Sequence, residues 1–172
     1  MNKFLQKAAE LKTQALPYRR RVEVVIQKGD TVLVTKNKDK ETGDAWFGFP
    51  GGGIEEQTAE KAAMDECLEE VGIKVKNVKS LGITHTQEGM MSKKEGRNEK
   101  YRGSITTWYS ADYVEVDRSK LGDDGDSRQY SWEGLSEAQE AVSKSKVMAT
   151  PRVKALRALK AVKSVEPKTD KV

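Results

Sequence analysis

A glycine turn and an acidic helical pattern adjoin in residues 49–73, which read FPGGGIEEQTAEKAAMDECLEEVGI. Thr58 can cap the first turn of a helix and Gly72 is suited to end it, so the segment predicts a helix between these residues. At about 100° per residue, one arc of about 120° carries three carboxylates and three small side chains. These are Glu66, Glu69, Glu70, Ala59, Ala62 and Ala63, and the neighbouring arc, expected to pack on a sheet, holds Met64, Cys67 and Val71.

Three like charges on one helix face call for a counter-charge. Each such pair destabilises a helix by about 0.2–0.5 kcal/mol, and no cation of this helix falls within the arc. Hard divalent cations bind carboxylate and carbonyl oxygens, and Mg²⁺ commonly takes further ligands from substrate phosphates. The alanines would leave room for such a substrate, and glycines let the backbone of the turn approach it. The pattern favours a metal–diphosphate site over a solvated acidic face, and the missing Gly-Lys-Ser/Thr ending argues against a P-loop.

The segment resembles the Nudix box, G-x5-E-x7-R-E-U-x-E-E-x-G-U, in which U is apolar. Two fixed positions depart from this pattern, since Gln57 stands in place of the first Glu and Asp65 in place of the Arg. The likeness extends over residues 20–145 through the order of the strands and the segment YSWEGLSEAQEA. The matching fixed positions are Gly51, Glu66, Glu69, Glu70 and Gly72, and the apolar ones are Cys67 and Ile73.

This resemblance implies a Nudix hydrolase fold, an α/β/α sandwich with a mixed β-sheet. It also implies an enzyme that uses Mg²⁺, or Mn²⁺ in its place, to hydrolyse a nucleoside diphosphate linked to another moiety. Carried over by position, Glu66, Glu69 and Glu70 bind the metal with the Gly51 carbonyl. Glu66 and Glu69 are the expected catalytic residues, because a metal-bound water needs a base nearby to become a nucleophile.

The two departures leave an alternative open. In the family the Arg orients a catalytic Glu through an ion pair, so Asp65 removes a supporting contact. Lys61 precedes Asp65 by four residues and is a candidate partner, as are Arg97 and Arg102 from other elements. Because the three expected ligands remain, we favour an active pyrophosphohydrolase of small nucleotides. A catalytically weak nucleotide-sensing module and an RNA 5′-end pyrophosphohydrolase or decapping enzyme are the alternatives.

Hydrophobic periodicity predicts the remaining elements. An amphipathic helix over 3–15 is expected to pack on the domain, and Gly29–Asp30 is expected to turn a hairpin. Strands are predicted at 21–27, 31–36, 46–50, 75–86 and 101–116, helices from about 136 and from 151, and loops at 37–44, 87–100 and 117–128. We expect a single Nudix hydrolase domain over residues 1–163, with a helix at each end, and a flexible basic tail over 164–172.

Composition bounds the setting. The chain has 172 residues and a net charge of +4, and residues 141–172 hold nine Lys or Arg against Glu166 and Asp170, so the basic charge lies at this end. Such a run is more often solvated than bound to RNA, although RNA is an alternative partner. Cys67 is the only cysteine, which rules out an intrachain disulfide and a multi-cysteine zinc site. Without a signal-like or membrane-spanning run, we expect a cytoplasmic protein with no membrane partner.

Substrate recognition has several candidates. Trp46 and Phe49 precede the glycines and can stack on a base, although strand alternation sends at least one aromatic ring of this segment into the core. Arg21, with Arg19 and Arg20, begins a strand and can contact phosphate. His85 is expected to be structural or exposed rather than catalytic. A further catalytic carboxylate is sought among Glu95, Glu99, Asp123, Asp124 and Asp126. The oligomeric state is left open.

Overall fold

The computed structural model describes residues 2–39, 42–89, 100–122 and 129–165. Helices are interleaved with runs of strands along the described chain, as the hydrophobic periodicity predicts. In chain order the elements are α1 Lys3–Gln14, β1 Tyr18–Lys28, β2 Thr31–Lys38, β3 Ala45–Gly48, β4 Gly51–Gly53, α2 Ala59–Val71, β5 Ile73–Glu88, β6 Gly103–Val116, β7 Gln129–Gly134, α4 Leu135–Ser143 and α5 Ala149–Val165.

One mixed sheet of seven strands organises these elements. Its strand order is β3-β2-β1-β6-β5, while β4 also pairs with β1 and β7 also pairs with β2. Strands β1 and β6 run parallel from the pair Tyr18 and Gly103 to the pair Gln27 and Asp112. The other pairings are antiparallel. The central β1 therefore pairs with three other strands, β2, β6 and the short glycine strand β4.

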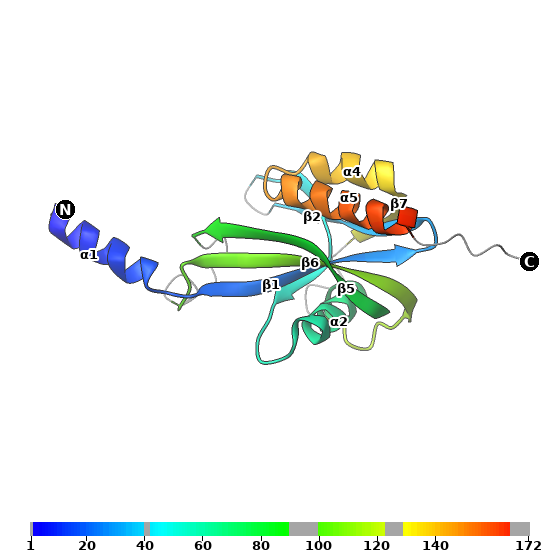
Figure 1. Cartoon of the computed structure of the whole chain (residues 1–172), viewed down its shortest axis with the longest axis horizontal. Coiled ribbons are helices and arrows are strands. Elements are labelled where there is room, and N and C mark those ends of the chain that lie inside the picture. The colour runs from blue at the N-terminus through cyan, green and yellow to red at the C-terminus, as the bar shows by residue number, and fades with distance from the viewer. Residues whose placement is uncertain (1, 40–41, 90–99, 123–128, 166–172) are drawn as a thin grey trace, which may run out of the picture.

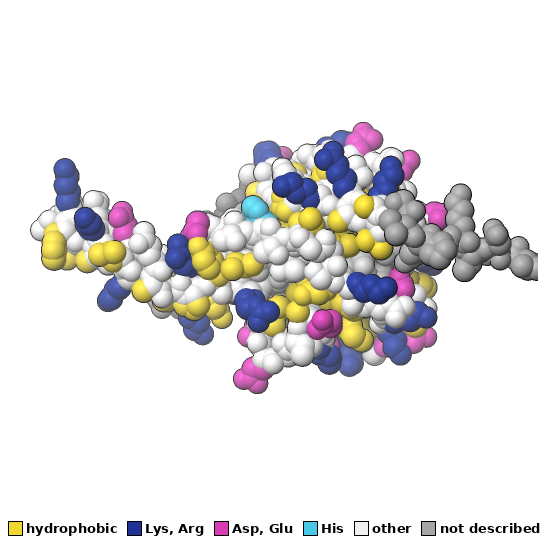
Figure 2. Space-filling view, in the orientation of Figure 1, with side chains coloured by type: hydrophobic (Ala, Val, Ile, Leu, Met, Phe, Trp, Pro, Cys, Tyr) yellow, Lys and Arg dark blue, Asp and Glu magenta, His cyan; other side chains and the backbone are white. Residues whose placement is uncertain are grey.

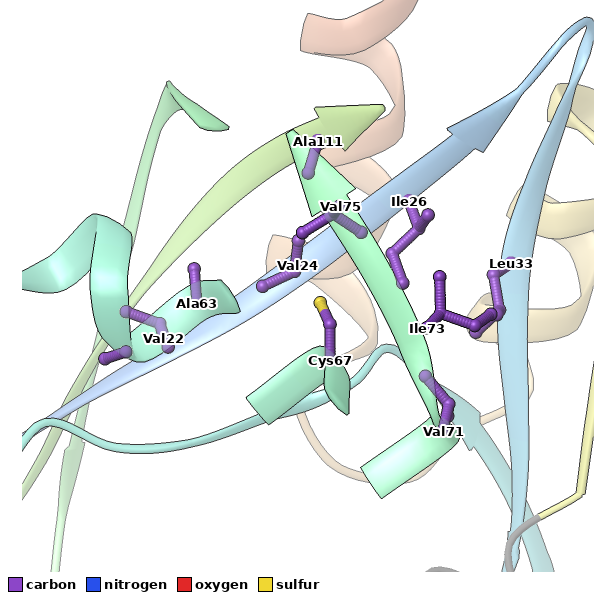
Figure 3. Close-up of a cluster of buried hydrophobic side chains, with 11 residues drawn as sticks. Val22, Val24, Ile26, Leu33, Ala63, Cys67, Val71, Ile73, Val75 and Ala111 are labelled. Carbon is purple, nitrogen blue, oxygen red and sulfur yellow. The ribbon is translucent and has the colours of Figure 1, made fainter. Parts of the chain in front are cut away.

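Helices cover both faces of the sheet (Figure 1), with α2 on one face and α4 and α5 on the other. Alternation along β1 divides its side chains between the two layers. Val22 and Val24 pack with Cys67 of α2 (Figure 3). On the opposite face Val25 packs with Leu156 of α5. This arrangement confirms the expected α/β/α sandwich with a mixed sheet.

Helix α1 differs from expectation, because it does not pack on the domain. It extends beyond the end of the sheet (Figure 1), and Figure 2 shows hydrophobic side chains exposed along it. Phe4, Leu5 and Leu11 keep 77%, 60% and 59% of their surface exposed. Periodicity identifies an apolar face but not what covers it, so the helix was predicted correctly and its packing wrongly.

Helix α2 has the predicted caps. The Thr58 side chain accepts a hydrogen bond from the Lys61 N–H, and Gly72 ends the helix in the left-handed region at φ 64°. Two expectations for its faces are wrong. Ala62 and Ala63 are fully buried in the core, so their small size brings α2 close to the sheet and does not leave room for a substrate. Met64 is exposed, whereas Cys67 and Val71 pack on the sheet as expected.

The remaining boundaries differ from prediction by a few residues. The strands predicted at 75–86 and 101–116 are β5 and β6, and the last helix continues to Val165. Much of the two long predicted loops, 90–99 and 123–128, lies outside the described residues. No helix of the described chain is both long and apolar enough to cross a membrane.

Burial makes a prediction for Cys67. Its side chain is fully buried, and desolvation, followed by the charges of Glu70 and Glu66, raises the pKa of the thiol. A raised pKa keeps the sulfur protonated, and the thiolate is the reactive form. We predict that an aromatic disulfide reagent at about pH 8 modifies the native protein at a small fraction of the rate for the unfolded chain. Equal rates, followed by absorbance of the released thiolate, would contradict the buried position.

Candidate metal and diphosphate site

The pairing of β4 with β1 determines where the polar atoms of Gly51 point. Gly51 lies opposite Glu23 in the antiparallel register. In the adjacent pair, the Val24 N–H donates to the Pro50 carbonyl at 2.8 Å. Hydrogen-bonded and non-hydrogen-bonded pairs alternate along an antiparallel ladder. The pair of Gly51 and Glu23 is therefore the non-hydrogen-bonded kind, and the N–H and C=O of Gly51 point away from β1.

Two glutamates of α2 meet this strand. The Gly51 N–H donates to Oε2 of Glu70 at 2.9 Å. Because the N–H and C=O of one strand residue point to the same side, the Gly51 carbonyl oxygen also faces this edge. Glu66 lies against the next glycine, since a Cβ added to Gly52 would be 2.3 Å from its Oε1. A Cβ at Gly52 would therefore displace the Glu66 carboxylate, which occupies the space of a side chain.

Glu69 is placed differently. Its residue is exposed, and its backbone carbonyl accepts a hydrogen bond from the Gly122 N–H at 2.9 Å. Within the described residues, no group of three or more His, Cys, Asp or Glu side chains is gathered as a metal site. The structure therefore brings Glu66 and Glu70 to the glycine strand and leaves Glu69 at the surface.

The donors at the glycine strand suit a hard divalent cation. Carboxylate oxygens of Glu66 and Glu70 and the carbonyl of Gly51 are the oxygen ligands that Mg²⁺ prefers. The space that Gly52 leaves free holds the Glu66 carboxylate beside the backbone. Because Mg²⁺ needs only one or two protein carboxylates when a substrate's phosphates complete its shell, this donor set fits the ion.

The two Nudix-box departures make local contacts. Asp65 forms an ion pair with Lys61, one of its three candidate partners. Gln57 accepts a hydrogen bond from the Glu55 N–H at 3.0 Å through its Oε1. Arg102 is instead held near α1, where it donates to the Gln14 carbonyl at 3.1 Å. Arg97, another candidate partner of Asp65, lies outside the described residues.

The candidate recognition residues are separated by the structure. Phe49 is buried in the core beneath α4 and α5, whereas Trp46 is half-buried with its ring 5.3 Å from the Arg152 guanidinium carbon. Arg21, also half-buried, pairs in register with Gly53. The arginine that contacts the glycine strand is Arg19, because a Cβ on Gly53 would lie 2.3 Å from its Nη2.

Of the other acid and base candidates, His85 lies within the described residues. His85 is half-buried in β5 and pairs with Thr106, which agrees with a structural placement. The late-loop carboxylates lie outside the described residues; these are Glu95, Glu99, Asp123, Asp124 and Asp126.

A buried ion pair next to the site was not predicted. Glu23 accepts hydrogen bonds from Arg152 Nη2 at 2.8 Å, Arg152 Nε at 3.1 Å and Trp108 Nε1 at 2.9 Å. Glu23 and Arg152 are both buried. A charged residue inside the apolar strand segment RVEVVI was the available signal, since such a charge needs a partner when buried. Its partner, 129 residues away, could be identified only from the fold.

Comparison with known proteins agrees with the fold. A family model described as the NUDIX domain matches residues 17–153, and the chain belongs to this family. As a member of it, the protein is a hydrolase of phosphorus-containing acid anhydrides. No curated protein matches the chain by sequence.

Three solved structures show the same fold at low sequence identity. A NUDIX hydrolase from Nitrosomonas europaea superposes with a TM-score of 0.63 and 18% identity, over 85% of this chain and 90% of that one. An ADP compounds hydrolase superposes with a TM-score of 0.66 and 18% identity, over 87% of this chain and 75% of that one. The E. coli ORF135 protein superposes with a TM-score of 0.58 and 17% identity, over 90% of this chain and 97% of that one.

The Gly52 contact predicts the effect of a single methyl group. In Gly52→Ala the new Cβ would collide with the Glu66 carboxylate, which must then leave the glycine strand. We predict at least about tenfold weaker binding of Mn²⁺, measured by electron paramagnetic resonance of the free ion. Gly122→Ala is the matched control, because its Cβ would meet nothing closer than 3.8 Å. Unchanged affinity in Gly52→Ala would show that Glu66 is not a ligand.

Proposed function

We propose that this protein is a Mg²⁺-dependent pyrophosphohydrolase that cleaves the diphosphate linkage of a small nucleoside diphosphate derivative. The observation that carries the proposal is the meeting of α2 with β4, where Glu70 accepts from the Gly51 N–H and Glu66 fills the space beside Gly52. Family membership supports the reaction class. The hard oxygen donors support Mg²⁺, with Mn²⁺ as a substitute.

Each residue has a role in this proposal. The carboxylates of Glu66 and Glu70 and the Gly51 carbonyl hold the metal, which when bound neutralises diphosphate charge and lowers the pKa of a coordinated water. Glu69, carried on the same helix and exposed, completes the set when substrate is bound. Glu66 and Glu69 are the two candidate bases, one of which would accept the proton of the attacking water. The Arg19 guanidinium, against Gly53, binds a substrate phosphate oxygen.

The nucleotide part of the substrate is inferred from a structural neighbour and from an aromatic side chain. A structural neighbour is named an ADP compounds hydrolase, which supports an adenosine-type or related nucleotide derivative. Trp46 is half-buried and is the aromatic candidate for stacking on a base, with Arg21 beside the glycine strand. Phe49 would act from the core by supporting the turn. The single free cysteine suits a reducing cytoplasm.

A nucleotide-sensing role is the second candidate, because Asp65 pairs with Lys61 and supports no glutamate of the site. Incubation with Mg²⁺ and a panel of nucleotides and 5′-modified RNAs, with products identified by mass, separates the candidates. Cleavage of a diphosphate linkage supports the hydrolase, whereas binding without any product supports the sensor. Release of diphosphate or of a cap nucleotide from RNA alone would select the RNA-processing alternative.

Substitution of the ligands tests the mechanism. We predict that Glu66→Gln and Glu70→Gln each lower kcat/KM by about a hundredfold or more, because each removes a charge that holds the metal and orients water. Glu140→Gln is the control, since Glu140 is an exposed carboxylate of α4 that pairs with Lys144. Hydrolysis that survives both ligand substitutions, or that persists in excess chelator, would contradict the proposed function.

A further inference from the structure

The Arg152 guanidinium contacts both segments that hold Gly51. On one side it makes two hydrogen bonds to the carboxylate of Glu23, at 2.8 and 3.1 Å. On the other it lies against β3, because a Cβ on Gly48 would be 3.2 Å from its Cζ. Its Nη1 donates to the Val147 carbonyl at 3.1 Å. One planar group therefore connects β1, β3 and the residues just before α5.

Glu23 transmits this contact to Gly51. The two residues are cross-strand partners, and a Cβ added to Gly51 would lie 2.8 Å from Cγ of Glu23. The Gly51 backbone thus rests on the Glu23 side chain, while its N–H is bonded to Glu70. Because Glu23 is also bonded to Trp108 Nε1, its carboxylate has a fixed orientation. A displacement of Glu23 would move the Gly51 carbonyl relative to Glu70.

A second contact secures the segment before Gly51. The Ser145 hydroxyl, buried between α4 and α5, accepts from the Phe47 N–H at 3.0 Å and donates to the Phe47 carbonyl at 2.8 Å. Phe47 and Gly48 end the strand that leads into the glycine strand. The residues joining α4 to α5 therefore hold this segment from the face opposite α2.

We propose that Arg152 is a positioning residue for the Gly51 carbonyl, acting through Glu23 and Gly48, so that the docking of α5 sets the metal affinity of the site beside α2. This inference rests on the proposed function, since it needs a metal at Gly51. The desolvation of a buried ion pair offsets much of its attraction, so the pair contributes geometry more than stability. Arg suits this role because its rigid fork makes several directed contacts at once, which Lys cannot.

The test uses two substitutions in α5, one expected to change the geometry of the metal site and one expected to change only the stability of the fold. Arg152→Lys keeps the charge and removes the fork, and we expect the dissociation constant for Mn²⁺ to rise about tenfold or more, measured by electron paramagnetic resonance. Hydrolysis at limiting Mn²⁺ should fall with it and return toward the wild-type rate at excess Mn²⁺. A purely structural role predicts no such rescue by metal.

Leu156→Ala is the matched control. Leu156 is also a residue of α5, it is buried in the apolar cluster between the sheet and α4 and α5, and it makes no hydrogen bond to Glu23. It should lower the thermal midpoint and leave the Mn²⁺ affinity unchanged. The pair Glu23→Gln with Arg152→Gln has no buried charge and provides a folded variant even where Arg152→Lys is unstable. It should weaken Mn²⁺ binding as Arg152→Lys does.

The outcomes separate this role from the proposed function. Wild-type Mn²⁺ affinity in both Arg152 variants, or an equal loss in Leu156→Ala, would overturn the positioning role alone. Mn²⁺ binding to the wild-type chain that is unaffected by Glu70→Gln would overturn the proposed function and, with it, the role of Arg152. Weaker binding in both Arg152 variants with an unchanged Leu156→Ala would support the proposal.

Discussion

The antiparallel pairing of β4 with β1 is the constraint on which the candidate site depends. It fixes Gly51 in a non-hydrogen-bonded pair with Glu23, so the peptide groups of Gly51 are free to meet α2. Each glycine of β4 lies against a different neighbour. A Cβ would collide with the Val22 carbonyl at Gly51, with Glu66 at Gly52 and with Arg19 at Gly53. Because the glycines of β4 have no side chains, the strand can lie close to the acidic helix α2 and to Arg19.

Carboxylates occupy both faces of the sheet here, with different partners. Glu23 is enclosed with Arg152 and Trp108, which satisfy both of its oxygens, and it supports the strand from the α5 side. Glu66 and Glu70 approach the same strand from the α2 side, where the Gly51 N–H contacts one of them. The first carboxylate gives the turn its geometry, and the other two provide the charge that a divalent cation needs.

Local patterns in the sequence predicted the helix from Thr58 to Gly72 and the hairpin, because caps and periodicity are short-range properties, whereas the sandwich was expected from the resemblance to the Nudix box. They also joined the glycines to the acidic helix, since both lie within one segment. Contacts between segments that are distant in the sequence were not predicted. Arg152 is 129 residues from Glu23, the burial of Ala62 and of Phe49 depends on layer packing, and the apolar face of α1 gave no sign that it stays exposed. These properties belong to the tertiary structure.

The most direct test of the account is the position of a bound ion in a crystal of the full chain grown with Mn²⁺. Anomalous scattering identifies the ion independently of the protein atoms. The account predicts a peak in contact with the Gly51 carbonyl oxygen and with carboxylate oxygens of Glu66 and Glu70, at about 2.0–2.3 Å. A fully occupied peak away from β4, or none at saturating Mn²⁺, would contradict it.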